Sequence, residues 1–337
     1  MRVAAFSELI GPDGVSIEER DDPRPEPSQA VVDVEACAIN RHDLWILQGD
    51  SAMVDAADLP FVSGLDVAGV VERVGEDCDV DPGDRVVLCP NQSCGTCRYC
   101  REGPENRCVE FSLYHGGLAE EALVSADRLV RLPDGVGPAA AAALPTAYVT
   151  AWHMIRRAGI GPGDRVLVPG ATGGVGVAAI QLLGVLGARS VGSSRSAERL
   201  ERVAALGADH TIESDDPEEM ADEVLEVGET TAVLNHLGGG GYLKAGLRTL
   251  ERGGRMVVCG RTAGDVGEID VSSVFLSHHH VIGSTMGTQP DLERLVEMTA
   301  DGALEPVVDG EFDLEETAAA FAAMQEDDTV GKLIVRP

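Results

Sequence analysis

Lysine is nearly absent from this 337-residue chain, which contains only Lys244 and Lys332. Acidic side chains number 57 against 26 basic ones, so the net charge is −31 at neutral pH. A surface this negative repels nucleic acid and anionic membranes. Because salt shrinks the Debye length to about 3 Å at 1 M, the composition predicts a protein of a very salty cytoplasm. An acidic protein of an ordinary cytoplasm is the alternative.

Long apolar runs are missing as well. None reaches the roughly 18 to 20 residues that a membrane-spanning helix needs. The first stretch, "MRVAAFSELI", reaches an acidic residue too early for a signal peptide. We therefore expect a soluble, cytoplasmic protein, and its length gives room for about two domains.

The pattern of expected strands and helices differs between two parts of the chain. Residues 1–130 contain short strand-like segments such as "AVVDVEA", separated by Gly, Pro and Asp, which is typical of a small β-barrel domain. In residues 131–285, apolar strands alternate with helical stretches of about ten to fifteen residues, a pattern typical of a parallel sheet covered on both faces. Residues 286–337 add two helical segments and a final strand, "KLIVRP".

A glycine-rich loop follows the apolar strand "RVLV". The loop consists of Ala171, Thr172, Gly173, Gly174, Val175 and Gly176. It is a G-x-G-x-x-G pattern with alanine in first place. Its second glycine lets the backbone approach a pyrophosphate, its third lets the helix pack close to the strand, and the helix N-terminus binds the phosphates. We therefore predict a dinucleotide site here.

The end of the next strand indicates which dinucleotide binds. A site for NAD places an acid there, whereas the 2′-phosphate of NADP needs a cation and no acid. Ser194 and Arg195 occupy this place. NADP is therefore the predicted cofactor, with NAD less favoured; the alternative is an Arg195 that only faces solvent.

Four cysteines gather in a short segment. Cys94, Cys97 and Cys100 are spaced C-x2-C-x2-C, and Cys108 follows soon after. Thiolates this close in sequence can surround one tetrahedral Zn²⁺ and leave it no open position, which predicts a structural zinc. Disulfides are the competing interpretation, which a reducing cytoplasm disfavours.

Together these features resemble the zinc-containing medium-chain dehydrogenase/reductase superfamily. The resemblance covers nearly the whole chain and includes "GLDVAGVVERVG", the cysteine segment, "GATGGVG" and "GKLIVRP". It implies an α/β protein whose GroES-like β-barrel catalytic domain (1–130, with the zinc lobe at about 89–110) precedes a Rossmann domain with a doubly wound parallel sheet (131–285). The tail (286–337) would complete the catalytic domain. The resemblance also implies an active site between the domains, a small-molecule substrate, and a homodimer or homotetramer.

The alcohol dehydrogenases of this superfamily carry a second, catalytic zinc, and this chain lacks the ligands expected for it. The aligned positions hold Asn40, Leu65 and Thr146. Leucine binds no metal, and neutral oxygens are poor ligands for zinc, which prefers thiolate and imidazole.

The chain is more similar to the zinc-free quinone oxidoreductase and enoyl reductase branches. It shares their Asn-x-x-Asp pattern at Asn40 and Asp43, and a G-x-D stretch ending at Asp66. Enones and quinones are already electrophilic, so positioning and hydrogen bonds can suffice for hydride transfer. This implies an NADPH-dependent reductase of an enone, enoyl thioester or quinone. Two alternatives stay open: an alcohol or aldehyde dehydrogenase with unusual zinc ligands such as Cys37, His42 and Asp66, and an NADPH-binding protein without turnover.

Each candidate catalytic residue has an expected role. Asn40 would donate a hydrogen bond to the substrate oxygen, and His42, with an unperturbed pKa of about 6.5, would supply the proton. Asp43 would cap or brace the helix that follows. Asp66 would orient His42 or bind the cofactor ribose, and Thr146 would face the nicotinamide.

Two further residues follow central strands of the second domain. His236 stands before "LGGGG", and Gly260 comes after "VVC". The resemblance places contacts with the nicotinamide at both positions.

Overall fold

The computed structural model describes residues 1–51, 53–326 and 328–337. The chain forms two compact units, one made of Met1–Thr146 together with Thr288–Pro337 and the other of Ala147–Gly287. The first unit is thus assembled from two separate segments of the chain. Within the described residues, every helix is too short or too polar to span a bilayer.

The first boundary between the units lies at residue 146, later than the position near 130 that the sequence indicated. Helix α3 (Pro138–Ala143) packs on strands of the first unit, and a π-helical turn (Leu144–Tyr148) carries the chain on into α4 (Val149–Ala158). Because the chain stays helical across this boundary, the pattern of apolar and polar residues does not change there.

The first unit is built around one large, mainly antiparallel sheet. Its strand order is β16-β17-β3-β4-β5-β9, and β8 also pairs with β3. The strands are β3 (Gln29–Ala38), β4 (Asp66–Val74), β5 (Arg85–Leu88), β8 (Glu121–Ser125), β9 (Leu129–Arg131), β16 (Val308–Asp313) and β17 (Lys332–Arg336). Strand β17 comes from the second segment of the chain and pairs antiparallel with β3. Side chains from both segments, including Phe6 and Phe321, share one buried core.

Shorter elements complete this unit. Two small strand pairs are β1 (Arg2–Phe6) with β2 (Val15–Glu19), and β6 (Asn91–Gln92) with β7 (Ser112–Leu113). The helices are α1 (Arg41–Leu47), α2 (Arg98–Glu102), α10 (Gln289–Ala300) and α11 (Thr317–Glu326). The last segment of the chain thus adds two strands and two helices to this mainly β unit.

The second unit is a six-stranded sheet in which all neighbouring strands are parallel. The strands are β10 (Arg165–Pro169), β11 (Arg189–Ser194), β12 (His210–Glu213), β13 (Thr230–Asn235), β14 (Leu250–Val258) and β15 (His280–Gly283). Their order is β12-β11-β10-β13-β14-β15, so the direction of winding reverses between β10 and β13. In open sheets of this kind, ligands bind at the carboxyl ends of the strands beside that reversal.

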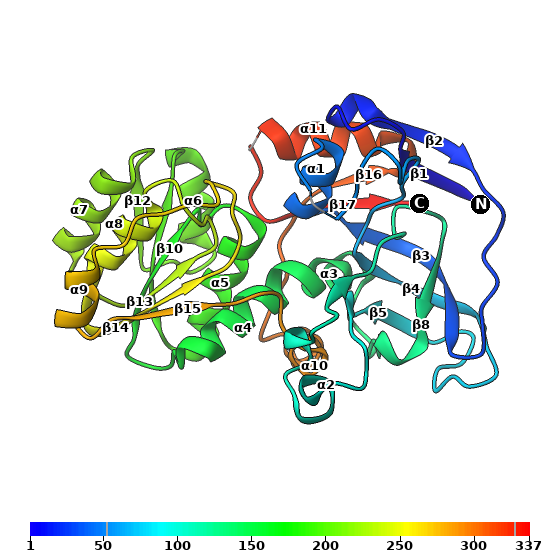
Figure 1. Ribbon diagram of the computed structural model, residues 1–337, viewed down its shortest axis with the longest axis horizontal. Helices are drawn as coiled ribbons and strands as arrows, with labels where there is room; N and C mark the ends of the chain where they lie inside the picture. The colour runs from blue at the N-terminus through cyan, green and yellow to red at the C-terminus, as the bar shows by residue number, and fades with distance from the viewer. Residues whose placement is uncertain (52, 327) are drawn as a thin grey trace. The chain divides into compact units, whose positions relative to one another are not determined.

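Helices cover both faces of this sheet. They are α4, α5 (Gly174–Leu186), α6 (Ala197–Ala205), α7 (Pro217–Val227), α8 (Tyr242–Thr249) and α9 (Val271–Leu276). Figure 1 shows α4 and α5 on one side of the strands and α7 and α8 on the other. Because both faces are covered, the central strands are apolar and fully buried, as at Val166 and Val233. The predicted α/β class with a doubly wound parallel sheet is confirmed.

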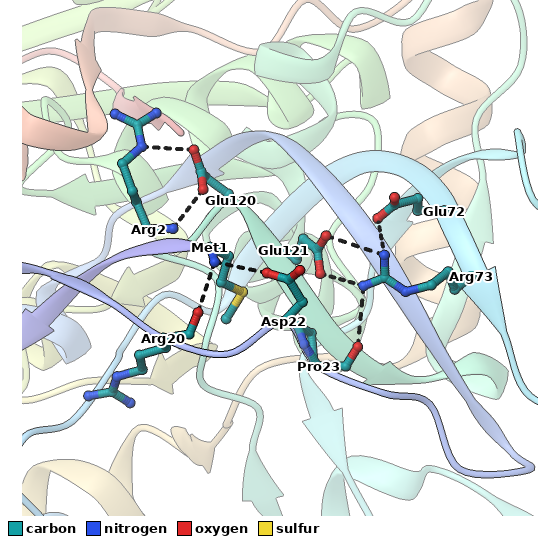
Figure 2. A network of polar contacts seen from close by, with 9 residues as sticks. All are labelled: Met1, Arg2, Arg20, Asp22, Pro23, Glu72, Arg73, Glu120 and Glu121. Carbon is teal, nitrogen blue, oxygen red and sulfur yellow. Dashed lines mark hydrogen bonds and ion pairs between the residues drawn. The ribbon is translucent and has the colours of Figure 1, made fainter.

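Arginine supplies the cations that join strands at the surface of the first unit. Arg73 of β4 pairs with Glu121 of β8 at 2.5 Å and with Glu72 at 2.8 Å. Dashed lines in Figure 2 mark both contacts. Arg2 of β1 pairs with Glu120 at 2.8 Å. Exposed pairs of this kind contribute between zero and about 1 kcal/mol each, and salt weakens them. The buried core therefore supplies most of the stability.

Candidate functional site

The glycine-rich loop joins β10 to α5. Gly173 caps the helix, and its N–H donates to the carbonyl of Gly170 at 3.2 Å. A Cβ on Gly176 would lie 2.4 Å from the carbonyl oxygen of Gly170, so close packing requires glycine at 176. A Cβ on Gly173 would come no nearer than 3.7 Å to the chain around it. Glycine at 173 therefore leaves open the space before the helix N-terminus, as pyrophosphate binding requires.

The other loop residues surround this turn. Ala171 and Thr172 are buried, and Gly174 and Val175 form the first turn of α5. The hydroxyl of Thr172 lies 3.5 Å from that of Ser194, the last residue of β11. Arg195 follows with an exposed side chain. The structure thus brings the loop and the end of the next strand together.

His236 and Gly260 also meet at this edge of the sheet. A Cβ on Gly170 would lie 3.2 Å from Cε1 of His236, and a Cβ on Gly260 would lie 2.5 Å from the His236 carbonyl oxygen. The carboxyl ends of β10, β13 and β14 therefore converge where the winding reverses. Burial lowers the pKa of His236 to about 4, so its ring is neutral at pH 7. Its buried Nε2 has no hydrogen-bond partner among the described residues.

The four clustered cysteines form a compact group of sulfur atoms in the first unit. Their Sγ atoms all lie within 4.8 Å of one another, at 3.9 Å for Cys94 and Cys100, 3.5 Å for Cys97 and Cys100, and 3.9 Å for Cys97 and Cys108. Tetrahedral Zn–S bonds of about 2.3 Å imply sulfur separations of about 3.8 Å. The backbone N–H of Glu110 donates to the Cys108 sulfur at 3.3 Å. This arrangement fits a zinc ion, and the sulfur separations of 3.5 to 3.9 Å are much longer than a disulfide bond of about 2.05 Å.

A second polar cluster is buried at the start of β4. Asp66 is fully buried, and its Oδ1 accepts a hydrogen bond of 2.6 Å from the hydroxyl of Thr146. Its Oδ2 accepts from Asn40 Nδ2 at 3.0 Å and from Lys332 Nζ at 3.3 Å. The Lys332 ammonium also donates to the carbonyl of Ile39 at 2.8 Å and to Asn40 Oδ1. Burial raises the pKa of Asp66, and the charge of Lys332 and the donated hydrogen bonds oppose that rise.

Asn40 therefore has other partners than the expected substrate oxygen. One amide hydrogen goes to Asp66 and the other to the carbonyl of Ala38 at 3.3 Å, while the amide oxygen accepts from Lys332. An amide NH₂ group has two hydrogens, so both are engaged. Donation to a substrate would require one of these bonds to break.

Asp43 braces the first turn of α1. Its Oδ2 accepts from the backbone N–H of Asn40 at 2.8 Å. Its Oδ1 accepts from the Ser63 hydroxyl at 2.5 Å and from the Gly64 N–H at 3.1 Å. Asp43 thus links the start of α1 to the segment at Ser63 and Gly64.

His42 stacks on a second histidine, His115, with ring centroids 5.4 Å apart. The Ser63 hydroxyl donates its one hydrogen to Asp43, so its oxygen accepts from Nδ1 of His115 at 3.3 Å. This assigns the lone pair of His115 to Nε2. Burial lowers the pKa of His115 to about 4, so the ring is neutral at pH 7. The ring also lines a pocket of about 200 Å³ beside Tyr114.

Sequence reasoning did not assign Lys332, Ser63 or His115 to a site. Lys332 stands in the closing strand motif and is one of only two lysines, which was the available signal. Ser63 and His115 stand in loops without a local pattern. Their partners lie far away along the chain.

Comparisons with known proteins agree with this architecture. Residues 26–134 match the alcohol dehydrogenase GroES-like domain, and residues 174–301 match the zinc-binding dehydrogenase family. An acryloyl-coenzyme A reductase of Sulfurisphaera tokodaii is 30% identical over 331 residues, which cover 96% of this chain and 97% of that protein.

Two solved structures extend the comparison. A NAD-dependent alcohol dehydrogenase is 32% identical, with a TM-score of 0.93 and full coverage of both chains. A 2-octenoyl-CoA carboxylase reductase, solved in complex with NADP and 2-octenoyl-CoA, is 25% identical, with a TM-score of 0.89 and coverage of 99% and 87%.

A GroES-like barrel joined to a dinucleotide-type parallel sheet defines a two-domain oxidoreductase. The chain belongs to the zinc-containing medium-chain dehydrogenase/reductase superfamily.

Proposed function

We propose that this protein is an NADPH-dependent reductase of enoyl thioesters, with enones and quinones as related acceptors. The observation that carries the proposal is the replacement of the expected metal ligands by Asn40, Leu65 and Thr146, with Asp66 and Lys332 beside them. Such a site suits a substrate that is electrophilic without a Lewis acid. Similarity to an acryloyl-coenzyme A reductase over nearly the whole chain supports the same class of substrate.

The reaction requires a hydride source, a hydrogen-bond donor and a proton source. A bound nicotinamide dinucleotide supplies the hydride that adds to the β-carbon of the enoyl group. The thioester oxygen then needs a hydrogen-bond donor, and the α-carbon needs a proton. Since both amide hydrogens of Asn40 are bonded within the protein, we assign Asn40 to positioning and His42, or water, to proton supply.

The glycine-rich loop, with Ser194 and Arg195 at the end of β11, supports NADP as the cofactor. An exposed cation and no acid at this position suit a 2′-phosphate. His236 and Gly260 are proposed to contact the nicotinamide, because both stand beside the loop where the winding reverses.

The cysteine cluster is proposed to hold one structural zinc ion in each chain. Cys94, Cys97, Cys100 and Cys108 would supply its four bonds. A site closed by four thiolates takes no part in the chemistry, and its role is to hold the segment around α2 together.

The protein is also proposed to form homo-oligomers in a salty cytoplasm. Strand β15 is the last strand of its sheet, and the helix before it exposes Val271 (71%), Phe275 (61%) and Leu276 (60%). An edge strand beside large exposed apolar side chains suits pairing with a second copy. The negative surface suits molar salt.

Steady-state assays in molar KCl test the reductase proposal. We expect NADPH oxidation with acryloyl-CoA and crotonyl-CoA, and one zinc per chain by metal analysis. Faster oxidation of simple alcohols, together with a second zinc, would favour an alcohol dehydrogenase. The similar structure of a NAD-dependent alcohol dehydrogenase is the reason to test for this reaction. Tight NADPH binding with no turnover on any acceptor would favour a non-catalytic binding protein.

A further inference from the structure

The residues around Asp66 do not fit a catalytic zinc ion. Leu65 is fully buried and has no donor atom. Asn40 and Thr146 direct their polar atoms to Asp66 and Lys332. The nearby Cys37 is buried, which raises the pKa of its thiol and keeps it protonated. The imidazole and thiolate ligands that zinc prefers are therefore not supplied by these positions.

An ammonium group occupies the centre of this cluster instead. Lys332 is 4% exposed, and its three N–H hydrogens have three acceptors: the Ile39 carbonyl, Asn40 Oδ1 and Asp66 Oδ2. A charged group this deep is stable only when it is paired and hydrogen-bonded. Because all three hydrogens are engaged, the ammonium can act on a substrate only through its partners.

We propose that the Lys332 ammonium is the resident cation of this site and that it, rather than a metal ion, fixes the orientation of Asn40 and Asp66. Through Asp66 it also fixes the hydroxyl of Thr146. Lys332 is thus a positioning residue. Its effect on turnover rests on the reductase function proposed above, whereas its place as the cation of the cluster does not.

Charge balance explains why the lysine matters. Asp66 is faced by Lys332 of β17, by the Asp43 carboxylate of α1 and by the neutral thiol of Cys37 on β3. Without the ammonium, burial and Asp43 both favour a proton on Asp66. A protonated Asp66 could no longer accept from both Asn40 and Thr146 with full strength, so both side chains would lose their fixed orientation.

Three variants test the positioning role. Lys332→Met removes the cation, Lys332→Met/Asp66→Asn removes both charges, and Lys244→Met is the matched control, because Lys244 is exposed and pairs only at the surface with Glu218. We expect Lys332→Met to lower kcat at least tenfold at pH 7.5, with partial recovery at higher pH as Asp66 ionises. The melting temperature of the double variant should lie closer to that of the wild type, but its kcat should still be at least tenfold lower. Lys244→Met should match the wild type.

If the double variant turned over at the wild-type rate, Lys332 would only neutralise Asp66 and the positioning role would be wrong. The double variant decides this point even where Lys332→Met alone fails to fold.

A second measurement needs no turnover. Lysine labelled with ¹³Cε and ¹⁵Nζ gives two side-chain signals, and Lys244→Met assigns them. We expect Lys332 to show a charged ammonium at pH 7.5 with slowly exchanging hydrogens, and its signal should move in Asp66→Asn. A neutral amine, or a second zinc that Asp66→Asn removes, would overturn the inference. A wild type that reduces no enoyl thioester but shows this ammonium signal would instead overturn the proposed function.

Discussion

The hydroxyl of Thr146 donates a 2.6 Å hydrogen bond to Oδ1 of Asp66, and this bond joins the helical turn after α3 to the first residue of β4. Asp66 is fully buried, so each donor that it keeps compensates for part of its lost hydration. The bond therefore contributes more to the free energy of unfolding than a bond from a neutral donor to an exposed acceptor would.

Thr146→Val should remove this donor while keeping the shape of the side chain. The buried carboxylate then loses a hydrogen bond, and we expect the free energy of unfolding to fall by about 1–3 kcal/mol. Urea titration at pH 7.5 in molar KCl measures it. Thr146→Ser keeps the hydroxyl and is the matched control. An unchanged Thr146→Val variant would mean that the bond adds nothing to stability.

Cys108→Ser should lose the proposed zinc ion. Cys108 lies 3.9 Å from Cys97 within the sulfur cluster, and three thiolates cannot close the site. We expect metal analysis to find less than one zinc per chain and the melting temperature to drop, as chelation of the wild type should also cause. Cys78→Ser lies outside the cluster and should keep both values. Full zinc content in Cys108→Ser would refute this ligand assignment.

Arg195→Ala should abolish the preference for NADPH. We expect the wild type to bind NADPH at least tenfold more tightly than NADH, and the variant to bind the two alike, because the proposed role of this cation is to pair with the 2′-phosphate, which NADH lacks. Fluorescence titration of both dinucleotides measures this. Arg294→Ala, which removes an exposed arginine paired with Glu297 on α10, is the control. Equal binding of the two dinucleotides by the wild type would contradict the assignment to NADP.

Acid should destabilise the fold between about pH 6.5 and pH 4. Burial holds the pKa of His115 and His236 at about 4, below the unfolded value of about 6.5, so the unfolded chain binds protons first as the pH falls. Each histidine should cost on the order of 2–3 kcal/mol across this window. Unfolding free energies for His236→Asn should therefore fall less steeply with acid than those of the wild type. A parallel pH dependence would show that His236 does not contribute.

Salt should stabilise this protein. Net repulsion from a charge of −31 opposes folding and weakens as salt screens it, whereas the exposed pairs of Arg2 and Arg73 lose only small contributions. We expect the melting temperature to rise between about 0.1 and 2 M KCl. A falling melting temperature would contradict adaptation to a salty cytoplasm.

Local patterns in the sequence predict the parts of the site that are local in the chain. Gly173 and Gly176 stand in one turn, and the four cysteines fall within a short segment, so their spacing is enough to indicate their geometry. The cluster at Asp66 is different, because the sequence separation to Lys332 is 266 residues. No periodicity connects two such positions, and only the pairing of β17 with β3 brings them together.

Asn40 illustrates a second limit. Its place in the Asn-x-x-Asp pattern indicated a polar site residue, but the direction of its amide depends on Ala38, Asp66 and Lys332. Hydrogen-bond competition of this kind is decided in three dimensions. The sequence therefore indicated the position of the site better than the role of each residue.

The return of the chain to the first unit has a consequence for biosynthesis. A ribosome makes Asn40 and Asp66 early, then the whole of residues 147–287, and only afterwards Lys332. Domains tend to fold as they emerge from the ribosome. The second unit can therefore fold before β17 has been synthesised and added to the sheet of the first unit. Until that strand inserts, Asp66 has no ammonium beside it. The cluster at Asp66 is therefore completed late, even though most of the first unit is translated before residues 147–287.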